Sequence, residues 1–218
     1  MTDDGSPAVE SPAFSHDPWV QIFIDPDESG GAGFIRIVES GGIPGVAILP
    51  ISGDRIGLVT NRRRPIKCDS LEIPRGFGGD SATSAEDAVR ELVEETGIQF
   101  DDKVDSLRRI GSVWPNNGLL AAEPILYVVL IGRNQPSSPR DTAEIKKFSW
   151  YELDDVMRLI AADKIKDSFT HSAVLRAVLM GYIDASRLDR GATPSKIRVR
   201  PQASDLRAED SSSDLRIE

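Results

Sequence analysis

The sequence predicts a single α+β domain of ordinary size with a tail at each end. Runs of β-branched and aromatic residues come first, followed by one clear helix, then more strands, and then two further helices. The regular strand–helix alternation of parallel α/β folds is missing. Hydrophobic residues make up 39% of the 218 residues and charged residues 28%, so the chain can bury a core.

Turn-forming sequences such as Asp-Pro, Gly-Gly and Ser-Gly-Asp separate the expected strands. We expect strands over residues 20–24, 34–38, 46–51, 56–60, 107–114, 124–131 and 145–150. Helices are expected over residues 84–96, 151–162 and 168–182. Thr83 or Ser84 can cap the first helix with Glu86 or Asp87 as the capping-box partner, and Gly97 stands where a helix-terminating glycine belongs.

The two ends of the chain differ in composition from the domain between them. Residues 1–18 are rich in Ser, Pro, Asp and Gly and are expected to form a flexible leader, and residues 19–183 the domain. Residues 184–218 mix charges with Ser and Pro without a sustained period and are expected to be a disordered tail. The start lacks a secretory signal and no stretch approaches 18 apolar residues, so we expect a cytoplasmic protein with no membrane partner.

Charge and cysteine content exclude some partners and sites. The net charge of −9 argues against a nucleic-acid partner, because nucleic-acid-binding proteins concentrate Lys and Arg on one face. It is compatible with a small phosphorylated substrate, since carboxylates reach phosphate through a divalent cation. Cys68 is the single cysteine, so an intramolecular disulfide and a Cys-rich zinc site are excluded; we expect it to be buried or half-buried.

The first expected helix carries an apolar stripe and a separate acidic side. Glu91, Glu94 and Glu95 fall at i, i+3 and i+4, on one side and away from the stripe. Their repulsion costs about 0.2–0.5 kcal/mol per close pair, and Arg90 can relieve Glu94 at i+4 but cannot neutralise all three acids. A divalent cation such as magnesium would turn this repulsion into coordination; a solvated acidic face is the alternative. The stripe consists of Ala85, Ala88, Val89, Leu92 and Val93.

The segment 76–98 resembles the Nudix box, whose pattern is G-x5-E-x7-R-E-U-x-E-E-x-G-U with U a bulky apolar residue. One specified position departs, because Ala82 stands where the family has its first glutamate. The resemblance implies an α/β/α sandwich with a mixed β-sheet and a catalytic loop and helix. It implies that Glu91, Glu94 and Glu95 bind Mg²⁺, with Mn²⁺ as a substitute, and that Arg90 orients them. It further implies a tight loop approach at Gly76 and a metal-binding backbone carbonyl at Arg75.

Residues 58–65 and 71–76 are similar to the ADP-ribose and nucleoside-diphosphate-sugar branch of that family. Two positions depart, because Asn61 replaces the usual Gln and Arg62 the usual aromatic residue. Arg63 and Arg64 are candidates for binding the diphosphate or the terminal ribose. A solvated basic patch at the end of a strand is the alternative interpretation.

Two loops outside the box extend the resemblance. The sequence 114–118, Trp-Pro-Asn-Asn-Gly, is similar to a loop of the same branch, so Trp114 is a candidate for base stacking or otherwise a core residue. Glu123 lies near the glutamate that follows this loop in the branch and is a candidate for substrate binding. Glu144 or Asp141 corresponds to a late loop acid and is a candidate general base; a solvent-exposed acid is the alternative.

The expected activity is metal-dependent hydrolysis of a nucleoside diphosphate linked to another moiety. ADP-ribose or a nucleoside-diphosphate sugar is the leading substrate, giving a nucleoside monophosphate and a sugar phosphate. The alternatives are another nucleotide (a dinucleotide polyphosphate, NADH or an oxidised nucleotide) and a non-catalytic Nudix-fold nucleotide sensor. Because members of the branch are usually homodimers that exchange strands near the N-terminus, the resemblance also implies a homodimer through residues 20–24 and 34–38.

Overall fold

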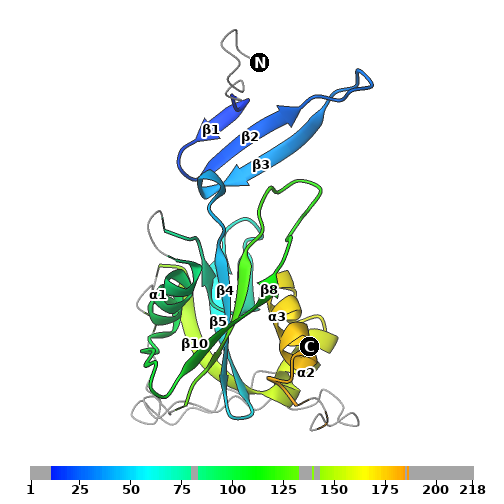
Figure 1. Cartoon of the computed structure of the whole chain (residues 1–218). Coiled ribbons are helices and arrows are strands. Elements are labelled where there is room, and N and C mark those ends of the chain that lie inside the picture. The colour runs from blue at the N-terminus through cyan, green and yellow to red at the C-terminus, as the bar shows by residue number, and fades with distance from the viewer. Residues whose placement is uncertain (1–10, 80–82, 133–138, 140–142, 185, 187–218) are drawn as a thin grey trace.

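The computed structural model describes residues 11–79, 83–132, 139, 143–184 and 186, which form two sheets and three α-helices (Figure 1). The small sheet contains β1 (Phe14–His16), β2 (Val20–Asp25) and β3 (Phe34–Glu39), and the 3-10 turn η1 (Ser40–Gly42) follows it. The large sheet contains β4 (Val46–Ser52), β5 (Arg55–Arg63), β6 (Cys68–Glu72), β7 (Arg75–Gly76), β8 (Ser106–Ser112), β9 (Ile125–Leu130) and β10 (Ile145–Glu152). The helices are α1 (Ser84–Thr96), α2 (Leu153–Ala161) and α3 (Ser168–Leu179).

The large sheet is mixed, with the order β10-β5-β4-β9-β8. Strands β4 and β9 are parallel, and the other pairs are antiparallel. Strand β4 pairs with β5 only at its end, at Ile51 and Ser52, and with β7 at its beginning, at Val46 and Ala47. β9 occupies the other edge of β4. The space that opens between β4 and β5 is filled by β6, which pairs with β5, and by β7, which pairs with β4. This insertion brings β7 to the helix α1, which contacts both β4 and β7.

Helices cover both faces of the large sheet, with α1 on one side and α2 and α3 on the other (Figure 1). Alternation along β4 explains the two cores, because successive side chains of a strand point to opposite faces. Val46 and Ile48 pack in the cluster with Leu92 of α1, whereas Leu49 packs in the cluster with Val174 of α3. The expected α+β class and sandwich with a mixed sheet are confirmed.

The expected helices and strands are present with small shifts at their ends. Residues 151 and 152 continue β10, where they pair with Ile56 and Arg55, so α2 begins at Leu153 and not at Tyr151. Helix α3 ends before the left-handed Gly181, short of the expected end at residue 182. Strands β1, β6 and β7 were not expected; β1 lies within residues 1–18, for which the sequence predicted a flexible leader. The tail expected from residue 184 lies almost entirely outside the described residues.

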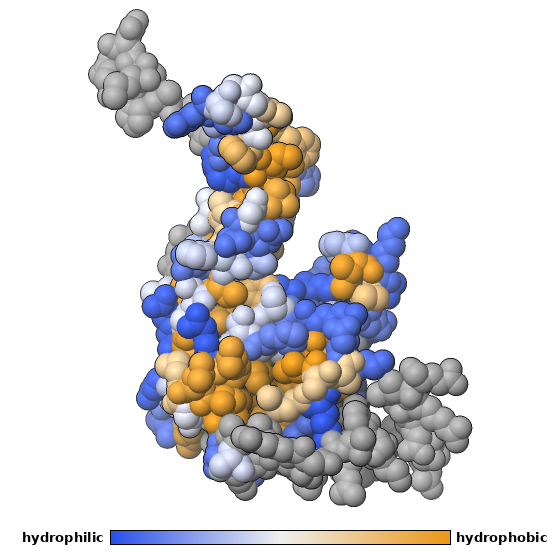
Figure 2. Space-filling model, turned by 90° about the vertical axis from the view of Figure 1, so that its right-hand side faces the viewer, coloured by the Kyte–Doolittle hydropathy of each residue, from blue (hydrophilic) through white to orange (hydrophobic). Residues whose placement is uncertain are grey.

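The small sheet projects from the domain and exposes apolar side chains, as Figure 2 shows together with a second apolar area on the face of α2 and α3. Hydrogen bonds attach β3 to the loop after β8: the Ile37 amide donates to the Leu119 carbonyl and the Ala121 amide to the Ile37 carbonyl, both at 2.8 Å.

Cys68 is exposed at the start of β6, so the expectation of a buried or half-buried cysteine is wrong. Among the described helices, none has the length and apolarity needed to cross a bilayer.

Candidate active site

A cavity of about 580 Å³ opens where α1, β7, the segment after β3 and the loop before β9 meet. Most of the side chains expected to act in substrate or metal binding line this cavity, although they come from segments far apart in the sequence. The lining consists of Glu39, residues 42–46, Arg63, residues 75–77, Arg90, Glu91, Glu94, Glu95, Pro115, residues 120–124, Glu144 and Phe169.

Local hydrogen bonds fix the register of α1. The Thr83 side chain accepts from the Glu86 amide, and the Glu86 carboxylate accepts from the Thr83 amide at 2.7 Å. The sequence allowed two caps and two partners, and the structure shows Thr83 as the cap and Glu86 as its partner. At the other end, Gly97 is left-handed with φ of 76°, and its amide donates to the Val93 carbonyl at 2.9 Å. The acids of the helix therefore lie at fixed positions relative to the cavity.

Two of the three glutamates are buried, contrary to the expectation that all three lie on a side away from the core. Glu91 is 8% exposed and Glu95 is 7% exposed, whereas Glu94 is half-buried. The reason is that α1 packs against β7 as well as against β4. The expected stripe is narrower than predicted: Ala88 and Leu92 are fully buried, Val89 and Val93 are half-buried, and Ala85 is exposed.

Arg90 connects the acids of α1 to the loop that precedes the helix. Its guanidinium lies 2.8 Å from the Glu91 carboxylate and 3.1 Å from that of Glu94. It also donates to the Phe77 carbonyl at 2.8 Å and lies 3.3 Å from Asp87. Charge-assisted hydrogen bonds of this kind are about twice as strong as neutral ones. This geometry suits the orienting role that the family resemblance implies for Arg90.

The backbone of β7 approaches the buried glutamates directly. The Arg75 amide donates to Glu95 Oε2 at 2.9 Å. A Cβ atom at Gly76 would overlap the carboxylate of Glu91. Only a residue without a side chain therefore allows β7 to lie against Glu91 in this arrangement.

Burial shifts the pKa of both buried glutamates. It raises the pKa of Glu95 to about 8, although the hydrogen bond from the Arg75 amide opposes this change. Burial also raises the pKa of Glu91, and the charge of Arg90 opposes that shift. Such raised pKa values indicate carboxylates that lack a sufficient counter-charge.

The carboxylates suit a hard divalent cation, which would supply that counter-charge. Within the described ranges, no three acidic, histidine or cysteine side chains converge as a ready-made metal-binding group. Glu91 and Glu94 instead face Arg90, and Glu95 faces the Arg75 amide. Cation binding thus requires local side-chain rotation within the cavity, with the Gly76 backbone leaving room for Glu91.

The remaining candidate residues separate into two groups. Arg63, Glu123 and Glu144 line the cavity; Glu123 and Glu144 are exposed, and Glu123 accepts from Ser112 Oγ at 2.5 Å. Arg64 is exposed and does not line it. Trp114 is 64% exposed and does not line it either, so the interpretation of Trp114 as a core residue is wrong. Asp141 and Ala82 lie outside the described residues.

The sequence did not identify Glu39 and Phe169, which also line the cavity. Glu39 ends β3, and an isolated acid at the end of a strand carries no signal of function. Phe169 lies in the first turn of α3, beside Asp167 and Thr170, whose side chains form that helix's N-terminal cap. The Asp-x-x-Thr spacing marks this turn in the sequence but does not show that it faces the cavity.

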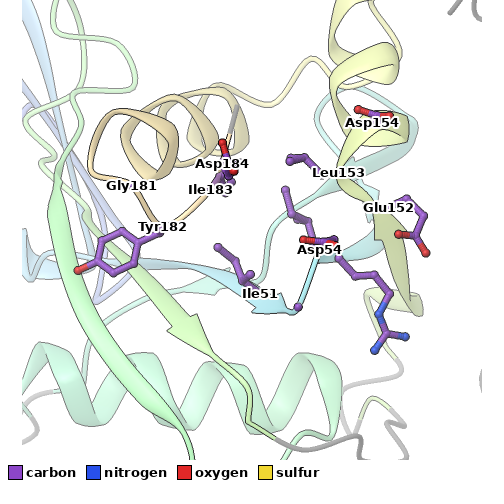
Figure 3. A pocket seen from close by; sticks show the side chains of 12 residues that line it. Ile51, Asp54, Glu152, Leu153, Asp154, Gly181, Tyr182, Ile183 and Asp184 are labelled. Carbon is purple, nitrogen blue, oxygen red and sulfur yellow. The ribbon is translucent and has the colours of Figure 1, made fainter. Parts of the chain in front are cut away.

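A second cavity of about 410 Å³ lies away from these residues, between the turn after β4, the beginning of α2 and the segment after α3 (Figure 3). Its lining includes Asp54, Glu152, Leu153, Tyr182 and Asp184. None of the candidate metal-binding or substrate-binding residues lines it, so we assign it no part in the chemistry.

Replacing Gly76 with alanine is expected to lower kcat and weaken activation by a divalent cation, each by about tenfold, because the new methyl group displaces Glu91. Steady-state kinetics at several magnesium concentrations measures both effects. Gly118→Ala is the matched control, since its added Cβ meets only the Asn116 side chain at an ordinary 3.7 Å. Equal kinetics for the two variants would show that the close approach at residue 76 has no functional role.

Comparisons with known proteins gave one family match and a structural similarity. The family model described as the NUDIX domain matches residues 43–173, which is more than half of the chain. A MutT/nudix family protein from Enterococcus faecalis is similar in structure, with 19% identity and a TM-score of 0.41 over 50% of this chain and 42% of that one. This chain thus spans less than half the length of that protein. No curated protein matches significantly. From the match to the NUDIX domain, the chain belongs to the Nudix family.

Proposed function

We propose that this protein is a metal-dependent pyrophosphohydrolase that cleaves a nucleoside diphosphate linked to another moiety. The observation that carries the proposal is the cavity of about 580 Å³, which Glu91, Glu94 and Glu95 line from the helix of the matched NUDIX domain. ADP-ribose or a nucleoside-diphosphate sugar is the proposed substrate. The products are a nucleoside monophosphate and a sugar phosphate.

Mg²⁺ is the proposed cofactor, with Mn²⁺ as a substitute, because both bind carboxylate and carbonyl oxygens. Glu91, Glu94, Glu95 and the backbone carbonyl of Arg75 would hold the cation. When bound, the cation would polarise the phosphoryl oxygens and make an associated water more acidic.

The other side chains of the cavity have separate proposed roles. Arg90 would orient Glu91 and Glu94, with which it forms two ion pairs. Arg63 lines the cavity and supplies positive charge for the diphosphate. Glu144, exposed at the cavity, would accept the proton of the attacking water. Glu123 would bind a hydroxyl group of the substrate.

A substrate panel tests this function. The purified chain is incubated with ADP-ribose, an ADP-sugar, a dinucleotide polyphosphate, NADH and an oxidised nucleoside triphosphate, each with Mg²⁺ and with Mn²⁺. We expect AMP and ribose phosphate from ADP-ribose at the highest kcat/KM. Preference for another member of the panel would reassign the substrate. Nucleotide binding without cleavage of any member would favour a sensor.

Glu144→Gln is expected to reduce kcat by about 10- to 100-fold with little change in KM, because a general base acts on the water and not on substrate affinity. Steady-state kinetics on the preferred substrate measures the effect. Glu28→Gln, which removes an exposed acid of the small sheet, should leave kcat unchanged. A kcat for Glu144→Gln within twofold of wild type would exclude Glu144 as the base.

A homodimer is the proposed assembly, formed through the small sheet. The exposed apolar side chains of this sheet would be covered in a dimer; they are Phe14, Trp19, Ile24, Phe34 and Ile35. Light scattering coupled to gel filtration should give twice the chain mass. Phe34→Ser combined with Ile35→Ser should give the mass of one chain, and a wild-type monomer would refute the proposal.

A further inference from the structure

A buried carboxylate beside the cavity has no role in the steps above. Glu72, at the end of β6, is only 1% exposed. Its Oε1 accepts hydrogen bonds from Arg63 Nε at 2.9 Å, from Arg63 Nη2 and from Asn61 Nδ2 at 3.4 Å. The same Oε1 atom lies 3.6 Å from Arg75 Nε. One buried oxygen therefore faces two guanidinium groups.

Both of these arginines line the cavity, which Glu95 and Glu144 also line. Arg75 is also held from its other side, since its Nη2 lies 3.4 Å from Asp167 Oδ1 and its guanidinium lies 4.3 Å from the centre of the Phe169 ring. The contacts thus join β5, β6, β7 and the first turn of α3. Each guanidinium is fixed in direction at the wall of the cavity.

The chemistry of these contacts favours positioning over simple stabilisation. A buried ion pair adds little net stability, because desolvation offsets the attraction. Two guanidinium groups at one end of a cavity also repel each other unless a carboxylate lies between them. Arg63 uses only part of its guanidinium on Glu72 and keeps further N–H donors for an anionic ligand.

We propose that Glu72 is a positioning residue that holds Arg63 and Arg75 for binding the anionic oxygens of the substrate's diphosphate. This role rests on the proposed function, and it makes Glu72 a residue that affects the affinity for the substrate. Glu72 contacts neither the substrate nor the cation in this scheme. Its removal therefore changes substrate binding and leaves the chemical step and metal binding in place.

The test is a mutant cycle on the preferred substrate of the panel. Glu72→Gln is expected to raise KM about tenfold, with kcat and the half-saturating magnesium concentration within twofold of wild type. Arg63→Gln should raise KM by a similar factor. The double variant should raise KM by less than the product of the two single effects, because Glu72 acts in part through that arginine and otherwise through Arg75. A merely structural Glu72 would instead lower kcat and weaken magnesium activation, or its effect would multiply with that of Arg63→Gln.

Asp69→Asn is the matched control for Glu72→Gln. Asp69 lies on the same strand and also binds two cationic side chains, Arg62 and Lys146, but outside the cavity. Its KM should equal that of wild type. If Glu72→Gln does not fold by circular dichroism, Arg63→Lys provides the test, because lysine keeps the charge but loses the two-point contact with Glu72.

An unchanged KM in Glu72→Gln, or in Arg63→Lys where that variant replaces it, would overturn the positioning role while the enzyme remained a hydrolase. A wild-type protein that cleaves no member of the panel would reject both the positioning role and the proposed function. The two failures are therefore distinguishable in one set of measurements.

Discussion

Glu95→Gln is expected to lower kcat by about 1,000-fold or more on the preferred substrate. The substitution keeps the shape of the side chain but removes the negative charge that a hard cation requires. Glu95 is buried, and Glu91 and Glu94 are themselves proposed ligands of the same cation, so neither of them can replace the charge that the substitution removes. A 1,000-fold loss corresponds to about 4 kcal/mol of transition-state stabilisation, which is within the range expected for loss of a metal-assisted step.

The measurement is steady-state kinetics with saturating Mg²⁺, together with titration calorimetry of Mg²⁺ binding. Glu86→Gln is the control on the same helix, because glutamine can complete the capping box with Thr83. Glu94→Gln should also abolish turnover, as a second test of the same site. Full activity of Glu95→Gln, or undiminished magnesium uptake by it, would remove Glu95 from the metal site.

The sequence predicted α1 residue for residue because its signals are local. The capping box between Thr83 and Glu86 and the left-handed Gly97 involve neighbours in the chain, so short-range chemistry determines both ends. The spacing of Glu91, Glu94 and Glu95 and the resemblance to the Nudix box also depend on a short segment. These features could therefore be recognised without any tertiary information.

The burial of Glu91 and Glu95 could not be predicted in the same way. Helical periodicity places one apolar stripe against one core, whereas α1 also packs against β7, a strand of two residues that carries no periodic signal. Trp114 illustrates the same limit, since its exposure depends on where a loop lies. The pairing of Glu72 with Arg63 and Arg75 depends on the insertion of β7 beside β4, which is a property of the sheet.

Metal-free protein is expected to lose stability as the pH rises from about 4.5 to about 8, because of Glu95. The pKa of Glu95 is raised from its ordinary 4.5 to about 8 in the folded protein, so between these values the folded state holds a proton that the unfolded chain releases. Its contribution is complete below pH 4.5 and is lost as the pH approaches 8. Burial dominates this pKa shift; Glu91 and Glu72 add to it, and Arg63 and the Arg75 amide oppose it.

The same substitution that abolishes turnover should therefore stabilise the metal-free protein. Chemical denaturation with EDTA present should give Glu95→Gln and wild type similar free energies of unfolding near pH 5. At pH 8 the variant should be more stable by on the order of 2–4 kcal/mol. Saturating Mg²⁺ at pH 8 should stabilise wild type and not the variant, because only wild type binds the cation. If the free energies of unfolding of the two proteins followed the same pH profile, ionisation of Glu95 would not destabilise the fold. A cation site predicts the opposite, because its buried carboxylate destabilises the protein until a cation balances the negative charge.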